Sequence, residues 1–164
     1  MYKVVKFPNS ILREKINKFD FNNSDIDPVQ LEKDLLECMY VNNGMGLSAN
    51  QVGLRYRVFV MGHKDSPQLG KAFFNPEVIS STDNLEDLPE GCLSFPDIYV
   101  KVKRPSAIKV RWQNSQGEWH EGEFRGYDCK CFLHELDHLE GITFKDRVGS
   151  VKWTMATSKN KRIG

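Results

Sequence analysis

The spacing of apolar residues predicts an amphipathic helix over residues 27–44. The apolar positions that recur at helical spacing are Leu31, Leu35, Cys38 and Met39. Asp27 is a suitable N-cap, Pro28 suits the first helical position, and Gln30 is expected to complete a capping box. The helix is expected to end at the Asn-Asn-Gly cluster of residues 42–44.

Short runs of Val, Ile and aromatic residues predict strands through the middle of the chain. The predicted strands are residues 56–61, 71–79, 98–104, 106–114 and 118–125. The turn at residues 114–117 is expected to join the last two strands into a hairpin. Residues 131–141 return to helical spacing, with Gly141 as the expected C-cap. Strands grouped before and beside two helices predict an α+β fold rather than a doubly wound α/β sheet.

Length and composition predict one globular domain. The chain has 164 residues, of which 40% are hydrophobic and 27% are charged. It contains no internal repeat and no low-complexity linker, so we expect a single domain over residues 1–164, ending in a short basic tail over residues 148–164. The net charge of +1 gives no general electrostatic reason to bind nucleic acid or an anionic membrane.

The sequence also indicates in which cellular compartment the protein is expected. No apolar run approaches the length of a membrane-spanning helix. Residues 1–15 lack the apolar core of a secretory signal and the Arg/Ser-rich character of a transit peptide. We therefore expect a cytoplasmic protein. In that compartment the four cysteines are expected to be thiols or metal ligands rather than disulfides, and they are Cys38, Cys92, Cys129 and Cys131.

The segment CFLHELDHLEG places His134 and His138 four positions apart, with Glu135 between them. On a helix, positions i and i+4 share one face, so both imidazoles can reach one metal ion. Glu135 lies about 100° around the axis, where its carboxylate can approach a metal-bound water without binding the metal. This H-E-x-x-H pattern is typical of metal hydrolases. The alternatives are coincidence and a structural metal clip, although a clip usually needs four protein ligands and no C-x-x-C is present.

Two histidines leave a third ligand to be found. Downstream of His138 stands Glu140, too close on the same helix, so an upstream residue is expected. The candidates, besides several acidic residues, are Cys92, Cys129, Cys131, His63 and His120. Cys92 lies in PEGCLSFP, residues 89–96, whose composition predicts a tight loop. The other two candidate cysteines are expected to pack or line a pocket, the two histidines to lie at the surface, and Cys38 to be buried in the core.

Three motifs occur in order along the chain: GMGLSANQ at residues 44–51, EGCLS at 90–94 and HELDHLEG at 134–141. Together they resemble the signature motifs of the peptide deformylase family, and the resemblance extends from about residue 3 to residue 147. It implies antiparallel β-sheets packed around a central helix that carries the H-E-x-x-H motif, with an N-terminal helix. It also implies a metal-dependent hydrolase that removes the formyl group from formyl-methionyl peptides of newly made proteins and releases formate.

The resemblance assigns one divalent metal ion to Cys92, His134 and His138, and the role of general acid and base to Glu135. It implies Fe²⁺ as the natural metal. The mixed thiolate and imidazole ligand set also accepts Zn²⁺, Ni²⁺ or Co²⁺.

The same resemblance assigns the substrate contacts. Gln51 and the backbone N–H of Leu93 match the donors that stabilise the oxyanion. The backbone of the loop around Gly46 is expected to contact the substrate. Met45 and Glu90 are expected near the pocket for the methionine side chain.

The expected partners are N-formylmethionyl nascent peptides, and the protein is expected to be a monomer. Transient ribosome contact stays open, because the C-terminal tail is compatible both with a docking element and with a frayed, solvated end. Its scattered basic residues are Lys152, Lys159, Lys161 and Arg162. Two other functions remain as alternatives: a metal-dependent peptidase or amidase of other specificity, and a non-catalytic metal-stabilised binding module. Glu135 and Gln51 argue against the binding module, since a structural metal clip needs neither.

Four positions depart from the family pattern: Ser48 replaces Ala, Leu133 replaces Gln, and Lys130 and Tyr127 replace apolar residues. The serine is small and little effect is expected from it. The leucine removes a polar group beside the predicted metal ligands. The lysine and tyrosine either change what is tolerated beside methionine or point to solvent. A salt bridge between Asp137 and Arg104 is expected to hold the second helix in register.

Overall fold

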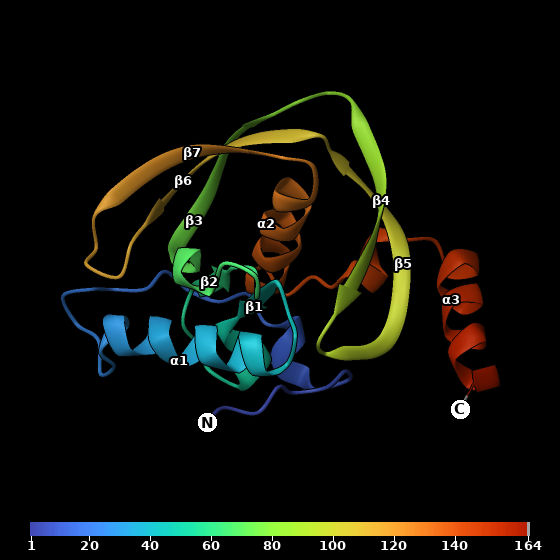
Figure 1. Cartoon of the computed structure of the whole chain (residues 1–164), viewed down its shortest axis with the longest axis horizontal. Coiled ribbons are helices and arrows are strands. Elements are labelled where there is room, and N and C mark those ends of the chain that lie inside the picture. Colours follow the sequence, from blue (N-terminus) through green and yellow to red (C-terminus); the bar gives the residue numbers. More distant parts are fainter. Residues whose placement is uncertain (164) are drawn as a thin grey trace.

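The computed structural model describes residues 1–163, and most of its elements surround one central helix, α2 (Figure 1). The α-helices within this range are α1 (Pro28–Val41), α2 (Gly126–Leu139) and α3 (Ser150–Ile163). The strands are β1 (Gly46–Ser48), β2 (Val58–Met61), β3 (Lys71–Ser81), β4 (Leu85–Cys92), β5 (Phe95–Pro105), β6 (Ala107–Gln113) and β7 (Trp119–Arg125). The predicted α+β class is confirmed.

Two antiparallel sheets flank α2. The larger has the strand order β1-β2-β3-β6-β7, and the β4–β5 hairpin forms the second sheet. Figure 1 shows α2 between the curved strands β3, β6 and β7 and the β4–β5 hairpin. Phe132 of α2 is fully buried against Phe59 and Phe73 of the larger sheet, with ring centroids 5.0 and 5.5 Å apart. Burial of such a side chain stabilises the fold by about 1.5–3 kcal/mol, so this apolar face anchors the helix.

Helix α1 follows the sequence prediction except at one position. Asp27 caps the helix by accepting a hydrogen bond of 3.0 Å from the backbone N–H of Val29, and Pro28 is the first helical residue. The predicted capping box is wrong, because the side chain of Gln30 donates to Asp34 one turn further along the helix. The buried residues of α1 are the four predicted apolar positions, Leu31, Leu35, Cys38 and Met39.

The β4–β5 hairpin differs from the prediction. Residues 89–92 are the end of β4 and not part of a loop, and Leu93 and Ser94 alone separate β4 from β5. The pattern of β4, LEDLPEGC, mixes apolar and acidic residues without strict alternation and contains proline and glycine, which are depleted in strands. Pairing with β5 along its whole length therefore supplies the order that the local sequence does not indicate. The adjacent hairpin of β6 and β7 was predicted correctly.

The C-terminal segment forms helix α3 from Ser150 and is not a frayed end. Trp153 packs edge-on against Phe95 of β5 and Phe144, with ring centroids 5.6 and 5.5 Å apart. The side chains of the last basic residues of the tail, and Gly164 as a whole, lie outside the described part of the chain. Among the described helices, none has the length and apolar character needed to cross a bilayer.

Candidate metal centre

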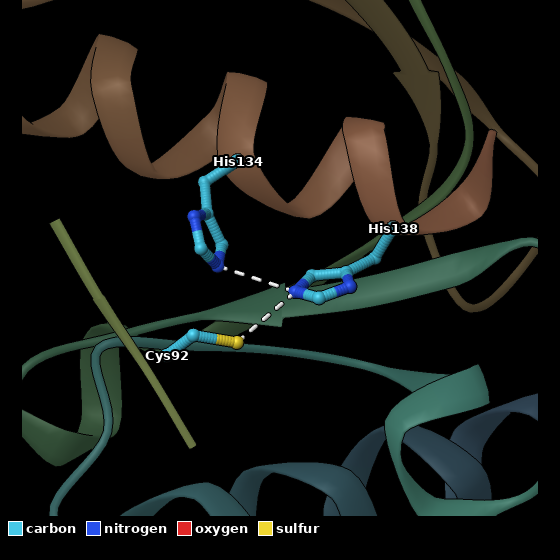
Figure 2. Close-up of side chains that lie close together, drawn as sticks. All are labelled: Cys92, His134 and His138. Carbon is cyan, nitrogen blue, oxygen red and sulfur yellow. Dashed lines mark hydrogen bonds between the residues drawn. The ribbon is translucent and has the colours of Figure 1, made fainter. Parts of the chain in front are cut away.

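Helix α2 presents His134 and His138 on one face, and their rings approach each other across one helical turn (Figure 2). The two Nε2 atoms are 3.2 Å apart. His138 is fully buried and His134 is 7% exposed. The spacing in the sequence accounts for this arrangement, because side chains at i and i+4 are neighbours on a helix.

Cys92 brings a third candidate ligand from the last position of β4. Its Sγ lies 3.3 Å from Nε2 of His138, and one ligand atom from each of the three residues lies within 4.8 Å of the others. Nitrogen and sulfur ligands bound at 2.0–2.3 Å to one tetrahedral ion lie about 3.3–3.6 Å apart. The two separations in this structure, 3.2 and 3.3 Å, are close to these values, so the three side chains fit a divalent ion.

Glu90 determines the orientation of the His134 ring. Its Oε1 accepts a hydrogen bond of 2.9 Å from Nδ1 of His134, which leaves Nε2 facing Cys92 and His138. Burial raises the pKa of the Glu90 carboxyl, but hydrogen bonds from His134 and Arg104 outweigh this effect and hold the pKa well below its usual range. Glu90 therefore stays ionised and keeps the proton of His134 on Nδ1, as in other metal-binding histidines.

Glu135 lies beside the three candidate ligands and has an unusual environment. Its side chain is buried, with 4% of the residue exposed, and Oε1 has no hydrogen-bond partner among the described residues. Burial raises the pKa of its carboxyl to about 7. A carboxyl with a pKa near neutrality is suited to accept a proton from one group and return it to another.

The side chain of Gln51 is held in one orientation. Its Oε1 accepts hydrogen bonds from the backbone N–H and the hydroxyl of Ser48, at 3.0 and 3.1 Å. Its Nε2 consequently faces the other way, 3.5 Å from Sγ of Cys92, and donates to Oγ of Ser94 at 3.1 Å. The amide nitrogen of Gln51 therefore lies at the edge of the candidate metal centre, with one N–H donated to Ser94 and the other directed at Sγ of Cys92.

A cleft of about 340 Å³ opens beside these residues, within the range of roughly 300–1,000 Å³ that is usual for ligand sites. Five of the predicted substrate and oxyanion residues line it, namely Met45, Gly46, Gln51, Glu90 and Leu93. Two residues that the sequence did not indicate, Ile98 and Tyr99 of β5, form part of the wall. Tyr99 is 71% exposed on a strand of alternating burial. An aromatic residue on the outward face of the alternating segment 98–104 was therefore the sequence feature that could have indicated this part of the cleft wall.

Three residues that depart from the family pattern, Lys130, Tyr127 and Leu133, lie in different surroundings. Lys130 and Tyr127 both line the cleft, and Lys130 is 5% exposed, so this lysine does not point to solvent. Leu133 is partly buried and packs on the apolar core beside α2. The predicted salt bridge is confirmed, with Nη1 of Arg104 2.9 Å from Oδ2 of Asp137.

The other candidate ligands lie elsewhere or have other contacts. His63 and His120 are exposed, in a loop and on β7 respectively. Cys129 is buried and its thiol donates to the backbone carbonyl of Pro105. Cys131 lines the cleft without joining the cluster of candidate ligands.

Comparison with known proteins gives a consistent result. The family model described as polypeptide deformylase matches residues 1–153. The chain is 38% identical over 162 residues to the peptide deformylase of Thermotoga maritima, covering 97% of this chain and 94% of the relative. The crystal structure of a peptide deformylase from Legionella pneumophila superposes with a TM-score of 0.89 at 29% identity, covering 99% of this chain and 96% of that one. For the crystal structure from Thermotoga maritima the TM-score is 0.83 at 36% identity, over 91% and 98% of the two chains.

Proposed function

The chain belongs to the polypeptide deformylase family, and from this premise we propose how its residues carry out the family's reaction. The protein is an enzyme that hydrolyses the N-formyl amide of nascent peptides, releasing formate and a free N-terminal amine. The observation that supports the assignment of roles is the position of Glu135, whose buried Oε1 has no partner among the described residues, beside three converging ligand atoms.

We propose that Cys92, His134 and His138 bind one divalent ion, with Fe²⁺ as the native metal. The thiolate and imidazole donors also suit Zn²⁺, Ni²⁺ and Co²⁺. A divalent ion bound by these residues would supply Lewis-acid chemistry, lowering the pKa of a bound water and polarising the formyl carbonyl. Glu90 contributes by holding the His134 ring in the orientation that ligation requires.

Glu135 is proposed to move the proton. Its buried carboxylate accepts a proton from the attacking water and passes it to the nitrogen of the breaking amide bond. A pKa raised to about 7 suits both steps at neutral pH. Gly46 lies against this carboxylate and leaves the room that the side chain needs.

Gln51 and the backbone N–H of Leu93 are proposed to stabilise the oxyanion that develops on the formyl oxygen. The contacts of Gln51 with Ser48 orient its amide N–H groups before substrate arrives. Preorganised donors of this kind are typically worth about 3 kcal/mol each in the transition state.

The cleft is proposed to hold the methionine side chain and the adjoining peptide. Met45, Gly46 and Leu93 would provide contacts, and the exposed Met45 side chain lies where a peptide would pass. Glu90 forms part of the wall, but its carboxylate is engaged by protein donors and is not offered to the substrate.

We further propose that the chain acts as a single domain over residues 1–164, as a monomer, in the cytoplasm. Transient contact with the ribosome through the C-terminal segment fits the proposed substrate, a nascent peptide. Sedimentation of the protein with purified ribosomes at two salt concentrations, with and without residues 148–164, would test that contact.

The main test is formate release from formyl-Met-Ala-Ser by protein that is purified anaerobically and reloaded separately with Fe²⁺, Ni²⁺ or Zn²⁺. Acetyl-Met-Ala-Ser is the control substrate, and the Glu135→Gln variant is the control protein. We expect the metal-loaded wild type to release formate from the formyl peptide, the apo protein and the variant to release none, and the acetyl peptide to yield no free N-terminal amine. Cleavage of the acetyl peptide at a similar rate would instead indicate an amidase of other specificity, and metal binding without turnover would indicate a binding module.

A further inference from the structure

Lys130 is a buried lysine whose charged group lies in the protein and not in solvent. It belongs to α2, and its side chain extends from the helix to the β4–β5 hairpin. Its Nζ donates to the backbone carbonyls of Leu88 and Val102 at 2.9 and 3.2 Å, and to Oε2 of Glu90 at 2.9 Å. An ammonium group has three donors, so these contacts use all of them.

Glu90 receives a full set of donors as a result. Oε2 accepts from Lys130 and from Nε of Arg104, and Oε1 accepts from Nη2 of Arg104 and from Nδ1 of His134. A carboxylate has about four acceptor positions, and here each oxygen has two donors. The Glu90 side chain therefore has little freedom to rotate away from His134.

The candidate metal ligands come from two separate elements, so their distances depend on how these elements dock. Cys92 is the last residue of β4, whereas His134 and His138 belong to α2. Lys130 spans the same junction, because Leu88 and Val102 are directly paired in the β4–β5 ladder. Its ammonium thus binds both strands of the hairpin and the carboxylate that orients His134.

We propose that Lys130 is a positioning residue of the metal centre, holding Glu90 against His134 and docking the Cys92 strand on α2. This inference rests on the proposed function, since it requires the ligands named there. It extends that function by giving a role to a residue that departs from the family pattern.

A role in selecting a polar or anionic substrate side chain fits the contacts less well. Lys130 lines the cleft, but all three of its donors are engaged by protein acceptors. What remains for the cleft wall is its methylene chain, which is compatible with an apolar methionine side chain. The positioning role and the selecting role predict different measurements, because the first changes metal retention and the second changes KM.

The test compares Lys130→Met with Lys101→Met in the Zn²⁺-loaded and Co²⁺-loaded proteins. Lys101 is exposed on β5 next to Val102, so its substitution removes a lysine from the outward face of the same hairpin. We expect Lys130→Met to release Zn²⁺ to a chromogenic chelator about tenfold faster than the wild type, in line with other residues that support a ligand. The thiolate-to-Co²⁺ absorption bands should shift, kcat should fall and KM should stay within about twofold of the wild type. Lys101→Met should match the wild type in all four measurements.

A second comparison identifies the route of the effect. In a Glu90→Gln background, Lys130→Met should accelerate Zn²⁺ release by less than it does in the wild type, because the part of its effect that acts through Glu90 is already lost and only the contacts with Leu88 and Val102 remain. Lys130→Arg keeps the charge and should restore part of the retention, and it also serves if the methionine variant does not fold. Wild-type retention in the folded Lys130→Met protein, or a raised KM with unchanged release, would overturn the inference. Failure of the wild type itself to bind one equivalent of metal would overturn the proposed function instead.

Discussion

Gly46 and Glu135 are in such close contact that any side chain at position 46 would force Glu135 to move. A Cβ atom on Gly46 would lie 2.6 Å from Oε2 of Glu135 and 2.8 Å from Sγ of Cys131. Real Cβ atoms do not approach other heavy atoms this closely, so a side chain there would displace the Glu135 carboxylate. Strand β1 thereby limits where the proposed general base can lie.

Gly46→Ala is therefore expected to lower kcat by about 100-fold, since a displacement of about 1 Å at a reacting group can cost that much. Formate release under saturating formyl-Met-Ala-Ser measures the change. Gly149→Ala is the matched control, because a Cβ at Gly149 would meet no atom within 4 Å. An alanine variant at position 46 with wild-type kcat would show that Glu135 tolerates displacement or does not carry the proton.

Removal of the metal is expected to lower the thermal stability of the protein, because the ion would join Cys92 of β4 to His134 and His138 of α2. A ligand present at 100 times its Kd stabilises the folded state by about 2.7 kcal/mol. For a protein of this size that corresponds to roughly 5–10 °C in Tm. We expect added Zn²⁺ to raise the Tm of the apo wild type by about this amount and to leave the Tm of His138→Ala unchanged. An equal shift in both proteins would mean that the metal binds elsewhere.

Gln51→Leu is expected to lower kcat by about 10²–10³-fold, the usual cost of removing one oxyanion donor. Metal content should be unaffected, because Gln51 is not among the proposed ligands. The check is kcat together with metal stoichiometry, measured on the same preparation. A loss of kcat that follows a loss of metal would argue against the oxyanion role.

Ser48→Ala serves as the comparison for Gln51. It removes the hydroxyl that contacts Oε1 but keeps the backbone N–H that contacts the same atom. We expect a fall in kcat of no more than about fivefold, since one neutral hydrogen bond contributes about 1 kcal/mol.

Arg104→Met is expected to destabilise the fold strongly. Arg104 bonds to both Glu90 and Asp137 while 5% exposed, so its removal would leave two buried carboxylates short of a partner. Breaking such a buried pair typically costs about 3–5 kcal/mol. Urea unfolding of the apo protein measures this loss, and Arg111→Met, which removes an exposed partner of Glu77, should cost about 0–1 kcal/mol. Similar losses in the two variants would contradict the expected importance of burial.

Local patterns in the sequence were sufficient where one element determines the outcome. Helix α1 could be predicted because its cap and its apolar spacing are properties of neighbouring residues. The pairing of His134 with His138 could be predicted because it depends on helical geometry alone. The hairpin of β6 and β7 follows from a short turn between two alternating segments.

Contacts between separate helices and strands could not be predicted from local sequence patterns. Spacing and composition left the third ligand open among several cysteines and histidines, until the resemblance to a family selected Cys92. Strand β4 mixes apolar and acidic residues with a proline and a glycine, and it is ordered by pairing with β5. The Gln30 side chain could bond either to the backbone of the N-cap Asp27 or to Asp34, and the structure shows the bond to Asp34.

The sequence by itself therefore determined the fold class, the helix that carries both histidines and, through three ordered motifs, the family. Only the tertiary structure decided that Lys130 is buried on Glu90 and that Gly46 confines Glu135. The physical reason is that periodicity records which face of one element is apolar. The partner of a buried charge is determined by the docking of distant segments, such as residues 90 and 130, which no local pattern encodes.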